Sequence, residues 1–202
     1  MIAILDYGAG NLQSVKNTLE AIGCGYTLVR DAKGLDQAAK IILPGVGHFG
    51  QMMRAIDELG LREPLKRRIL AGVPFLGICL GMQALFESSE EAPEVHGLAL
   101  YEGMVRRFPA EARVPHMGWN ELEVKADSKL FRNLPARPYV YFAHSYYVPE
   151  NDRAAATCTY ELKYTAALES GNVYGVQFHP EKSGELGQEI VKNFLADQVH
   201  PC

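Results

Sequence analysis

The sequence of 202 residues lacks the features that mark exported, membrane-bound or nucleic-acid-binding proteins. Its four cysteines, Cys24, Cys79, Cys158 and Cys202, form no Cys-x-x-Cys pair and no secreted disulfide framework. No apolar run is long enough to span a bilayer, and the first residues have neither the basic flank nor the cleavage site of an export signal. The net charge of −4 argues against a surface for polyanions. We therefore expect a cytoplasmic protein without nucleic-acid or membrane partners, in which Cys24, Cys158 and Cys202 are bystanders.

Patterns for cofactors and metals are missing as well. The segment Gly8-Ala9-Gly10 lacks the third glycine of a dinucleotide-binding loop, because Gln13 stands in its place. The sequence has no Gly-x-x-x-x-Gly-Lys-Ser/Thr phosphate loop, and its histidines show no metal-ligand spacing. The sequence predicts neither a metal nor a cofactor.

What the first half does contain is an alternation of strand and helix patterns. Short apolar runs near residues 2–5, 26–29, 41–43 and 73–78 read as strands, and between them apolar residues recur at helical spacing. The stripe before the second strand consists of Leu12, Val15, Leu19 and Ile22. This alternation predicts an α/β fold with a mostly parallel central sheet and helices on both faces.

From about residue 98 the pattern changes to short β-like runs separated by turn signals. We expect strands near residues 100–107, 121–124, 139–142, 154–160, 165–169 and 173–178, so additional antiparallel strands belong to the second half. A closing helix carries Leu186, Ile190, Val191, Phe194 and Leu195 on one face. No linker or repeat divides the chain, and a single domain over residues 1–202 is the prediction.

The most informative segment is a cysteine flanked by glycines directly after an apolar run, Gly77-Ile78-Cys79-Leu80-Gly81. A Gly-x-Cys-x-Gly segment in this position is the thiol version of the strand-to-helix nucleophile elbow. At such a helix start, free N–H groups favour the thiolate and can bind an oxyanion. A packing cysteine followed by glycine turns is the alternative interpretation.

A base for this nucleophile is offered by His179-Pro180-Glu181, which follows the apolar run at residues 173–178. If that run is a strand parallel to the one before Cys79, His179 reaches the same sheet edge as the thiol. Glu181 would then orient the imidazole and stabilise its charged form. The turn Pro44-Gly45-Val46-Gly47 at a third strand end could aim an N–H at an oxyanion. Taken alone, the first motif could be surface decoration and the second an ordinary loop.

Together these motifs resemble the class I (triad) glutamine amidotransferases, which have a flavodoxin-like fold. The likeness rests on residues 77–83 (Gly-Ile-Cys-Leu-Gly-Met-Gln) and 176–181 (Val-Gln-Phe-His-Pro-Glu). More narrowly, residues 6–11, 44–47, 115–120 and 179–183 look like the glutaminase subunits of imidazole glycerol phosphate synthase, an enzyme of histidine biosynthesis. The resemblance runs from Met1 to about Leu195.

The resemblance implies a glutaminase that hydrolyses glutamine to glutamate and ammonia through a Cys79 thioester. It implies a Cys79, His179 and Glu181 triad, with the N–H groups of Leu80 and Val46 as the oxyanion hole. Glutamine would be held by Gly47, Gln83, Glu91, Ser145 and Tyr146. The residues alone leave other readings open: Gln83 as an exposed helix residue, Glu91 as part of a solvated acidic run and Tyr146 as a strand aromatic.

The resemblance also implies a heterodimer with a cyclase subunit of (βα)₈-barrel fold that receives the ammonia. The positions that match the family's interface are Asn11, Trp119, Tyr141 and Lys182, although Trp119 could equally be a core residue. Because Gly45 permits a peptide flip, the Val46 N–H could face away from the oxyanion site until the partner is loaded.

Three other functions share parts of this pattern. A class I amidotransferase subunit of another pathway (anthranilate, aminodeoxychorismate, pyridoxal phosphate or purine synthesis) would use the same chemistry with another acceptor. A cysteine peptidase on a related flavodoxin-like scaffold would cleave peptides and release no ammonia from glutamine. A docking subunit without catalysis would not need Cys79.

Overall fold

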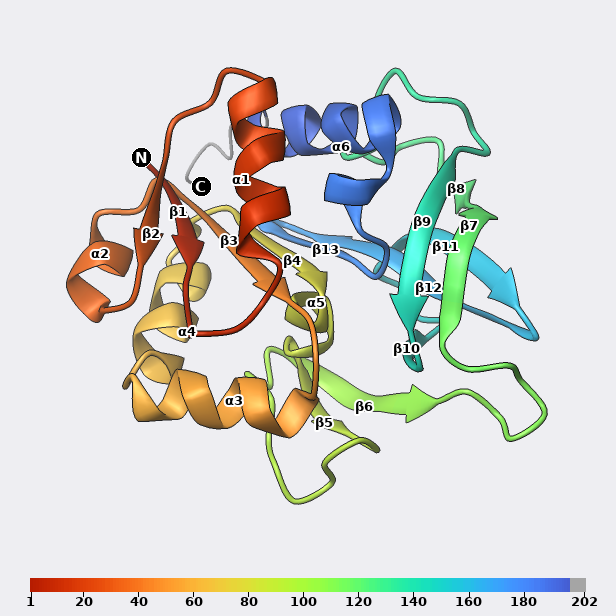
Figure 1. Ribbon diagram of the computed structural model, residues 1–202, viewed down its shortest axis with the longest axis horizontal. Coiled ribbons are helices and arrows are strands. Elements are labelled where there is room, and N and C mark those ends of the chain that lie inside the picture. The colour runs from red at the N-terminus through yellow and green to blue at the C-terminus, as the bar shows by residue number, and fades with distance from the viewer. Residues whose placement is uncertain (197–202) are drawn as a thin grey trace.

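The computed structural model describes residues 1–196, and Cys202 therefore lies outside the described residues. The chain forms one continuous mixed sheet with helices packed against it and a separate pair of strands at one side (Figure 1). None of the helices in the described part is long and apolar enough to cross a membrane.

The first part of the sheet consists of five parallel strands in the order β2-β1-β3-β4-β13. Helices connect the first four of these strands in chain order, and the connection from the second to the third strand passes the first, so that the first strand lies between them. The strands are β1 (Ile2–Leu5), β2 (Tyr26–Val29), β3 (Lys40–Gly45), β4 (Phe75–Cys79) and β13 (Val173–Val176).

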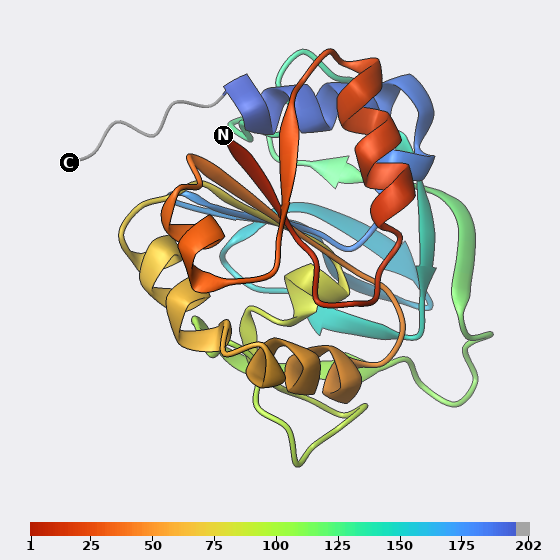
Figure 2. The ribbon, with the colours of Figure 1, turned by 60° about the vertical axis from the view of Figure 1, so that its left-hand side comes forward.

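Helices cover both faces of this parallel part (Figures 1 and 2). On one face lie α1 (Leu12–Ala21) and α6 (Gly184–Ala196), and on the other lie α2 (Ala32–Asp36), α3 (Phe49–Glu58) and α4 (Arg62–Leu70). The predicted parallel sheet with helices on both faces is therefore confirmed.

Successive residues of a strand point to opposite faces of the sheet and therefore belong to two different hydrophobic cores. In β1, Ala3 and Leu5 pack into the core under α3 and α4, while Ile4 between them packs into the core under α1 and α6. In β3, Ile42 likewise packs into the core under α1 and α6, while Ile41 and Leu43 pack into the core on the other face. Strands buried on both faces need continuous apolar runs, which is the pattern that the sequence shows.

The second half adds antiparallel strands to the sheet. β12 (Leu162–Ser170) pairs antiparallel with β13, with β10 (Tyr146–Pro149) and with β11 (Ala154–Tyr160), which is joined by β8 (Glu123–Val124). Two further strands, β6 (Tyr101–Arg107) and β5 (Phe86–Ser89), extend the sheet beyond β10. The expected antiparallel strands are present, whereas β5 and β10 were not predicted.

A two-stranded antiparallel ribbon of β7 (His116–Glu121) and β9 (Tyr139–His144) stands beside the sheet (Figure 1). The sequence pattern predicted a strand at 121–124, whereas β7 occupies the segment before it. The segment is hard to recognise as a strand because the usual pattern is reversed: the polar His116 is buried, whereas the apolar Met117 and Trp119 are exposed.

Between the ribbon and the sheet lies a buried polar cluster of His116, His144 and Tyr164. His144 Nδ1–H donates to the carbonyl of Tyr146 at 2.7 Å, which leaves Nε2 to face Tyr164 Oη at 3.2 Å and His116 Nδ1 at 3.3 Å. Burial lowers the pKa of His116 to about 4. Burial, outweighing the hydrogen bond to Tyr146, lowers the pKa of His144 to about 3.

These two histidines make the fold sensitive to acid. Below the ordinary histidine pKa of 6.5 the unfolded chain binds protons that the buried rings do not. The contribution of the two rings to stability is therefore complete above pH 6.5 and is lost as the pH falls to about 4 for His116 and about 3 for His144. We predict that the free energy of unfolding, measured by urea titration, falls across this window. His116→Phe, whose ring would remain stacked between Phe142 and Tyr160, should reduce the slope.

The matched control is His96→Phe at an exposed position, which should leave the slope unchanged. An unfolding free energy independent of pH between 6.5 and 4 would contradict the account.

Candidate active site

The carboxyl ends of three parallel strands bring the predicted residues to one edge of the sheet. Gly45 of β3 is the register partner of Cys79 in β4, and Val176 of β13 is the partner of Ile78. The turn after β3, the thiol at the end of β4 and the histidine after β13 therefore meet. The parallel orientation on which the prediction depended is confirmed.

Cys79 has a backbone conformation that non-glycine residues rarely adopt, with φ 53° and ψ −108°. Such a conformation costs on the order of 1–3 kcal/mol and persists only where the surroundings enforce it. It turns the chain from β4 directly into α5 (Leu80–Gln83). The result is the elbow predicted from the sequence, with the thiol at its tip.

Glycines enforce the elbow by letting α5 approach three strands. A Cβ added to Gly77 would overlap the backbone of Gly81, and a Cβ on Gly81 would overlap the Leu43 carbonyl of β3. A Cβ on Gly175 of β13 would lie 2.7 Å from the side chain of Met82. The small neighbours of Cys79 are therefore needed for the close approach of helix to sheet.

The candidate base is buried and fully oriented. Glu181 Oε1 accepts a hydrogen bond from His179 Nδ1 at 2.8 Å, and both side chains are only 3% exposed. With Nδ1 committed to the carboxylate, Nε2 is left for the thiol of Cys79, with which His179 also shares a hydrogen bond. The side chains of Cys79, His179 and Glu181 thus lie next to one another in that order. The alternative that His179 and Glu181 are surface residues is excluded.

The thiol and the carboxylate decide the charge of the imidazole. Burial alone would lower the pKa of His179, but the hydrogen bonds and negative charges of Cys79 and Glu181 outweigh it and raise the pKa to about 10. At neutral pH the imidazole of His179 therefore carries two protons.

The loop that carries His179 is tied to the ribbon by Ser183, whose role the sequence analysis missed. Its hydroxyl donates to the His179 carbonyl at 2.7 Å and accepts from the Tyr141 N–H at 3.0 Å. The N–H of His179 donates to the Tyr141 carbonyl at 2.8 Å. Position 183 ends the His-Pro-Glu-Lys-Ser motif, so the motif was the signal that pointed to it.

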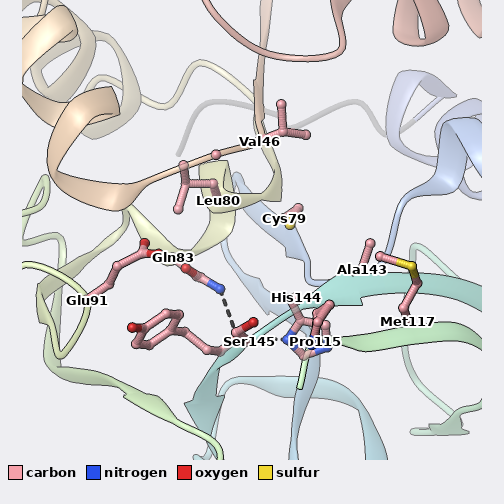
Figure 3. Close-up of a pocket in the computed structure, with 12 residues that line it drawn as sticks. Val46, Cys79, Leu80, Gln83, Glu91, Pro115, Met117, Ala143, His144 and Ser145 are labelled. Atoms are coloured by element: carbon pink, nitrogen blue, oxygen red, sulfur yellow. Dashed lines mark hydrogen bonds between the residues drawn. The ribbon is translucent and has the colours of Figure 1, made fainter. Parts of the chain in front are cut away.

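Beside the thiol is a pocket of about 190 Å³. Val46 and Leu80 lie on one side of Cys79, with His144 and Ser145 on the other (Figure 3). All eight pocket residues that the sequence analysis named line it, namely Val46, Gly47, Cys79, Leu80, Gln83, Glu91, Ser145 and Tyr146. The structure brings them together, while their individual roles stay predictions.

Two of these side chains already have partners. Gln83 is only 3% exposed, which excludes the interpretation of an exposed helix residue. Its Nε2 donates to the carbonyl of Tyr146 and to Oε1 of Gln177, each at 3.0 Å. Glu91 accepts the N–H of Phe49 at 2.7 Å at the start of α3, which holds its carboxylate at the pocket wall. Tyr146 is both a strand aromatic of β10 and a pocket residue.

The Val46 amide lies beside the phenol of Tyr7, in the loop after β1. Burial raises the pKa of Tyr7 to about 12, with a lowering contribution from the Val46 backbone. The Tyr7 hydroxyl is buried without a well-formed hydrogen bond to any described residue. The predicted second oxyanion donor therefore adjoins a phenol that has a free hydrogen-bonding position.

Three of the four predicted interface residues lie in contact with one another. The Trp119 ring packs edge-on against Tyr141 at 6.2 Å between centroids, and Lys182 Nζ lies 5.7 Å from the centroid of the Tyr141 ring. Asn11 precedes α1, which packs against the 3₁₀ helix η1 (Pro180–Lys182). Trp119 is 56% exposed, which excludes the alternative of a core residue.

Within residues 1–196, no three His, Cys, Asp or Glu side chains gather as a metal site would require. The site is thus a thiol, an imidazole and a carboxylate beside a small pocket, which is the arrangement of a hydrolase that forms a thioester.

Comparisons with known proteins agree with this class. The family model of class I glutamine amidotransferases matches residues 3–198. An imidazole glycerol phosphate synthase subunit HisH of Methanothermobacter thermautotrophicus is 48% identical over 96% of this chain and 98% of its own length. The HisH subunit of Deinococcus radiodurans is 46% identical over 96% of this chain and 92% of its own.

Solved structures agree on the fold. A glutamine amidotransferase crystal structure superposes with a TM-score of 0.76 at 21% identity, over 96% of each chain. A chain of PurLQS from Thermotoga maritima superposes with a TM-score of 0.72 at 22% identity, again over 96% of each chain. The protein belongs to the class I glutamine amidotransferases and, within that class, to the family of imidazole glycerol phosphate synthase subunits HisH. The resemblance seen in the motifs is confirmed.

The Glu181 carboxylate gives a direct test of the triad. Glu181→Gln removes the charge that stabilises the imidazolium and offers His179 an amide in its place. We predict that kcat for glutamine hydrolysis falls by about 10²–10⁴-fold while the protein stays folded. Steady-state ammonia release and thermal unfolding measure the two effects.

Glu185→Gln, at an exposed position in the first turn of α6, is the control and should keep its activity. Equal kcat values for both variants would remove Glu181 from the mechanism.

Proposed function

We propose that this chain is the glutaminase subunit of imidazole glycerol phosphate synthase in histidine biosynthesis, acting as a single glutaminase domain over residues 1–202. The observation that carries the proposal is the contiguous Cys79, His179 and Glu181 array beside a pocket, in a chain 48% identical to a HisH subunit. It hydrolyses glutamine to glutamate and ammonia and delivers the ammonia to a cyclase subunit.

In the first half of the reaction the Cys79 thiolate attacks the side-chain amide carbon of glutamine. The carbonyl oxygen becomes an oxyanion, held by the N–H groups of Leu80 and Val46. The protonated His179 donates its proton to the nitrogen, the C–N bond breaks, and ammonia leaves. The raised pKa of His179 supports this step, because the ring holds the required proton beforehand.

In the second half the neutral His179 takes a proton from a water molecule, which attacks the thioester. The C–S bond breaks, the thiolate of Cys79 is restored with an imidazolium beside it, and glutamate leaves. Glu181 keeps the ring in the same orientation in both halves, since its hydrogen bond to Nδ1 leaves Nε2 at the reacting atoms.

The pocket residues hold the glutamine that reacts. Glu91 presents a carboxylate for its α-amino group, and Gln83 presents its carbonyl oxygen because both amide protons are engaged elsewhere. Gly47, Ser145 and Tyr146 contribute backbone groups at the pocket wall. No cofactor takes part.

The partner is a cyclase with a (βα)₈ barrel, and the complex is a heterodimer in the cytoplasm. Exposed apolar side chains on the ribbon support a docking surface there: Met117 is 64% exposed, Trp119 56% and Tyr139 54%. The site opens toward the same ribbon, because Met117 also lines the pocket. The ammonia is therefore released on the side of the site that faces the partner.

Partner binding also regulates the reaction. The Val46 amide beside Tyr7 and the glycines on either side of Val46 support a turn in which the second oxyanion donor is withheld in the free subunit. Removal of one such donor costs roughly 10²–10³-fold in rate. The isolated chain should therefore be a poor glutaminase, and the ligand-loaded cyclase should raise its activity by a comparable factor.

The test compares Cys79→Ala with the parent chain in complex with a cyclase subunit and its aminoimidazole carboxamide nucleotide. We predict that the variant complex loses glutamine-dependent synthesis and keeps synthesis from added ammonium salt, because only the ammonia source is removed. Unchanged glutamine-dependent synthesis would establish the docking subunit without catalysis.

The interface is tested by Trp119→Ala. A half-exposed aromatic at the centre of an interface typically contributes 2 kcal/mol or more, so we predict that the dissociation constant of the complex rises about 30-fold or more. Isothermal titration calorimetry measures it.

Leu70→Ala is the control, since Leu70 is 74% exposed on α4 and distant from the ribbon in sequence and fold. Equal affinities of the two variants would place the interface elsewhere.

The HisH relatives, at 42–48% identity, favour this pathway over other amidotransferase pathways. No observation favours a peptidase.

A further inference from the structure

Gln177 contacts the nucleophile but belongs to none of the groups assigned above. It is fully buried in the segment between β13 and His179, and its backbone N–H donates to the Ala166 carbonyl at 2.8 Å. Its side-chain Nε2 donates to Cys79 Sγ at 3.5 Å, across 98 positions of sequence. The sulfur is therefore held from two directions, by the imidazole of His179 and by this amide.

The orientation of the Gln177 amide is fixed by a chain of hydrogen bonds that begins at a carbonyl. The Tyr146 carbonyl can only accept, so the Gln83 atom that faces it must be Nε2. The same Gln83 nitrogen donates to Gln177, whose facing atom must therefore be Oε1. The opposite atom of the Gln177 amide, the one at the sulfur, is then an N–H donor.

A donor that cannot turn into an acceptor discriminates between the two forms of a thiol. A thiolate accepts the Gln177 N–H as a charge-assisted hydrogen bond, whereas a neutral thiol accepts it weakly. Because both ends of the Gln177 amide are constrained, little reorganisation is needed when the charge forms.

We propose that Gln177 is a thiolate-positioning residue, which holds the Cys79 sulfur in its charged form and aims it at the pocket. The proposal rests on the proposed function only in taking Cys79 as the reacting thiol. Gln177 is then a fourth side chain at the reacting sulfur, beside the triad, and Gln83 fixes the orientation of its amide.

The role of Gln177 can be distinguished from that of the charged and titratable groups around the sulfur. His179 faces it from the loop after β13 with Glu181 behind, Tyr7 from the loop after β1, and Tyr164 from β12. Burial raises the pKa of both Tyr7 and Tyr164, so both stay neutral through the neutral range. Gln177 does not titrate, and its removal should displace the pH profile of the thiol without adding a step.

The experiment measures alkylation of Cys79 by iodoacetamide across pH in the full chain, with peptide-resolved mass spectrometry. The variant is Gln177→Leu, similar in size and without a donor. We expect the pH of half-maximal alkylation to rise by about one unit and the rate at pH values below the parent midpoint to fall about tenfold, with the alkaline plateau unchanged. The partly buried Cys24 is the internal reference in the same digest, and Gln37→Leu at an exposed position is the matched control.

Gln177→Glu separates the sulfur contact from the contact with Gln83. It keeps an acceptor for Gln83 Nε2 but replaces the donor at the sulfur with a negative charge. We expect its profile to move further than that of Gln177→Leu, with a KM for glutamine near that of the parent complex and a lower kcat. Far-UV circular dichroism checks that both variants fold, and Gln177→Leu tests the proposal if the buried carboxylate prevents folding.

An alkylation profile that stays at the parent position in folded Gln177→Leu overturns the proposal, even if glutaminase activity falls, since the residue would then act only through Gln83. Alkylation reports on the thiol and not on glutamine. A parent complex with the ligand-loaded cyclase that is inactive with glutamine, together with a displaced profile in Gln177→Leu, would therefore reject the proposed function and retain this inference.

Discussion

The conformation of Cys79 is the constraint from which the rest of the site follows. Its backbone is held at a positive φ because α5 lies so close to β3, β4 and β13 that the contact positions must be glycine. The strain is offset by the cores on both faces of the sheet, which fix those strands. The elbow places the sulfur at the sheet edge and the N–H of Leu80 directly after it.

The second element is the proton next to that sulfur. Glu181 orients His179 and, together with Cys79, raises the pKa of the ring, while Ser183 and the Tyr141 backbone hold the loop in place. Tyr141 also carries the Trp119 and Lys182 contacts on the exposed ribbon. The surface proposed for the partner and the loop of the catalytic base therefore both contact strand β9. A shift of β9 on docking would act directly on the loop that carries His179.

The sequence was sufficient for features that depend on local spacing. The Gly-x-Cys-x-Gly elbow, the two-residue spacing of His179 and Glu181 and the alternation of strands and helices are all short-range patterns. The shared sheet edge followed from one rule about parallel strands, and the structure agrees with it. Five of the pocket residues were assigned to glutamine binding only through resemblance to a family, namely Gly47, Gln83, Glu91, Ser145 and Tyr146, since their contacts join segments far apart in the chain.

Features that depend on long-range contacts were missed. Gln177 meets Cys79 across 98 positions, and the histidine cluster joins β7, β9 and β12. No local pattern distinguishes His116 from a surface histidine, because its burial is decided by Phe142, Tyr160 and Tyr164. The strand β7 was missed for a related reason, since its outward side chains are apolar and exposed.

The measurement that tests the account most directly is the protonation of His179 by ¹⁵N NMR. The account predicts an imidazole that carries two protons at neutral pH and loses one near pH 10, and that titrates at lower pH in Cys79→Ala, where the sulfur that raises the pKa of His179 is absent. A His179 ring that is neutral at pH 7 and titrates near 6.5 in the parent protein would contradict it.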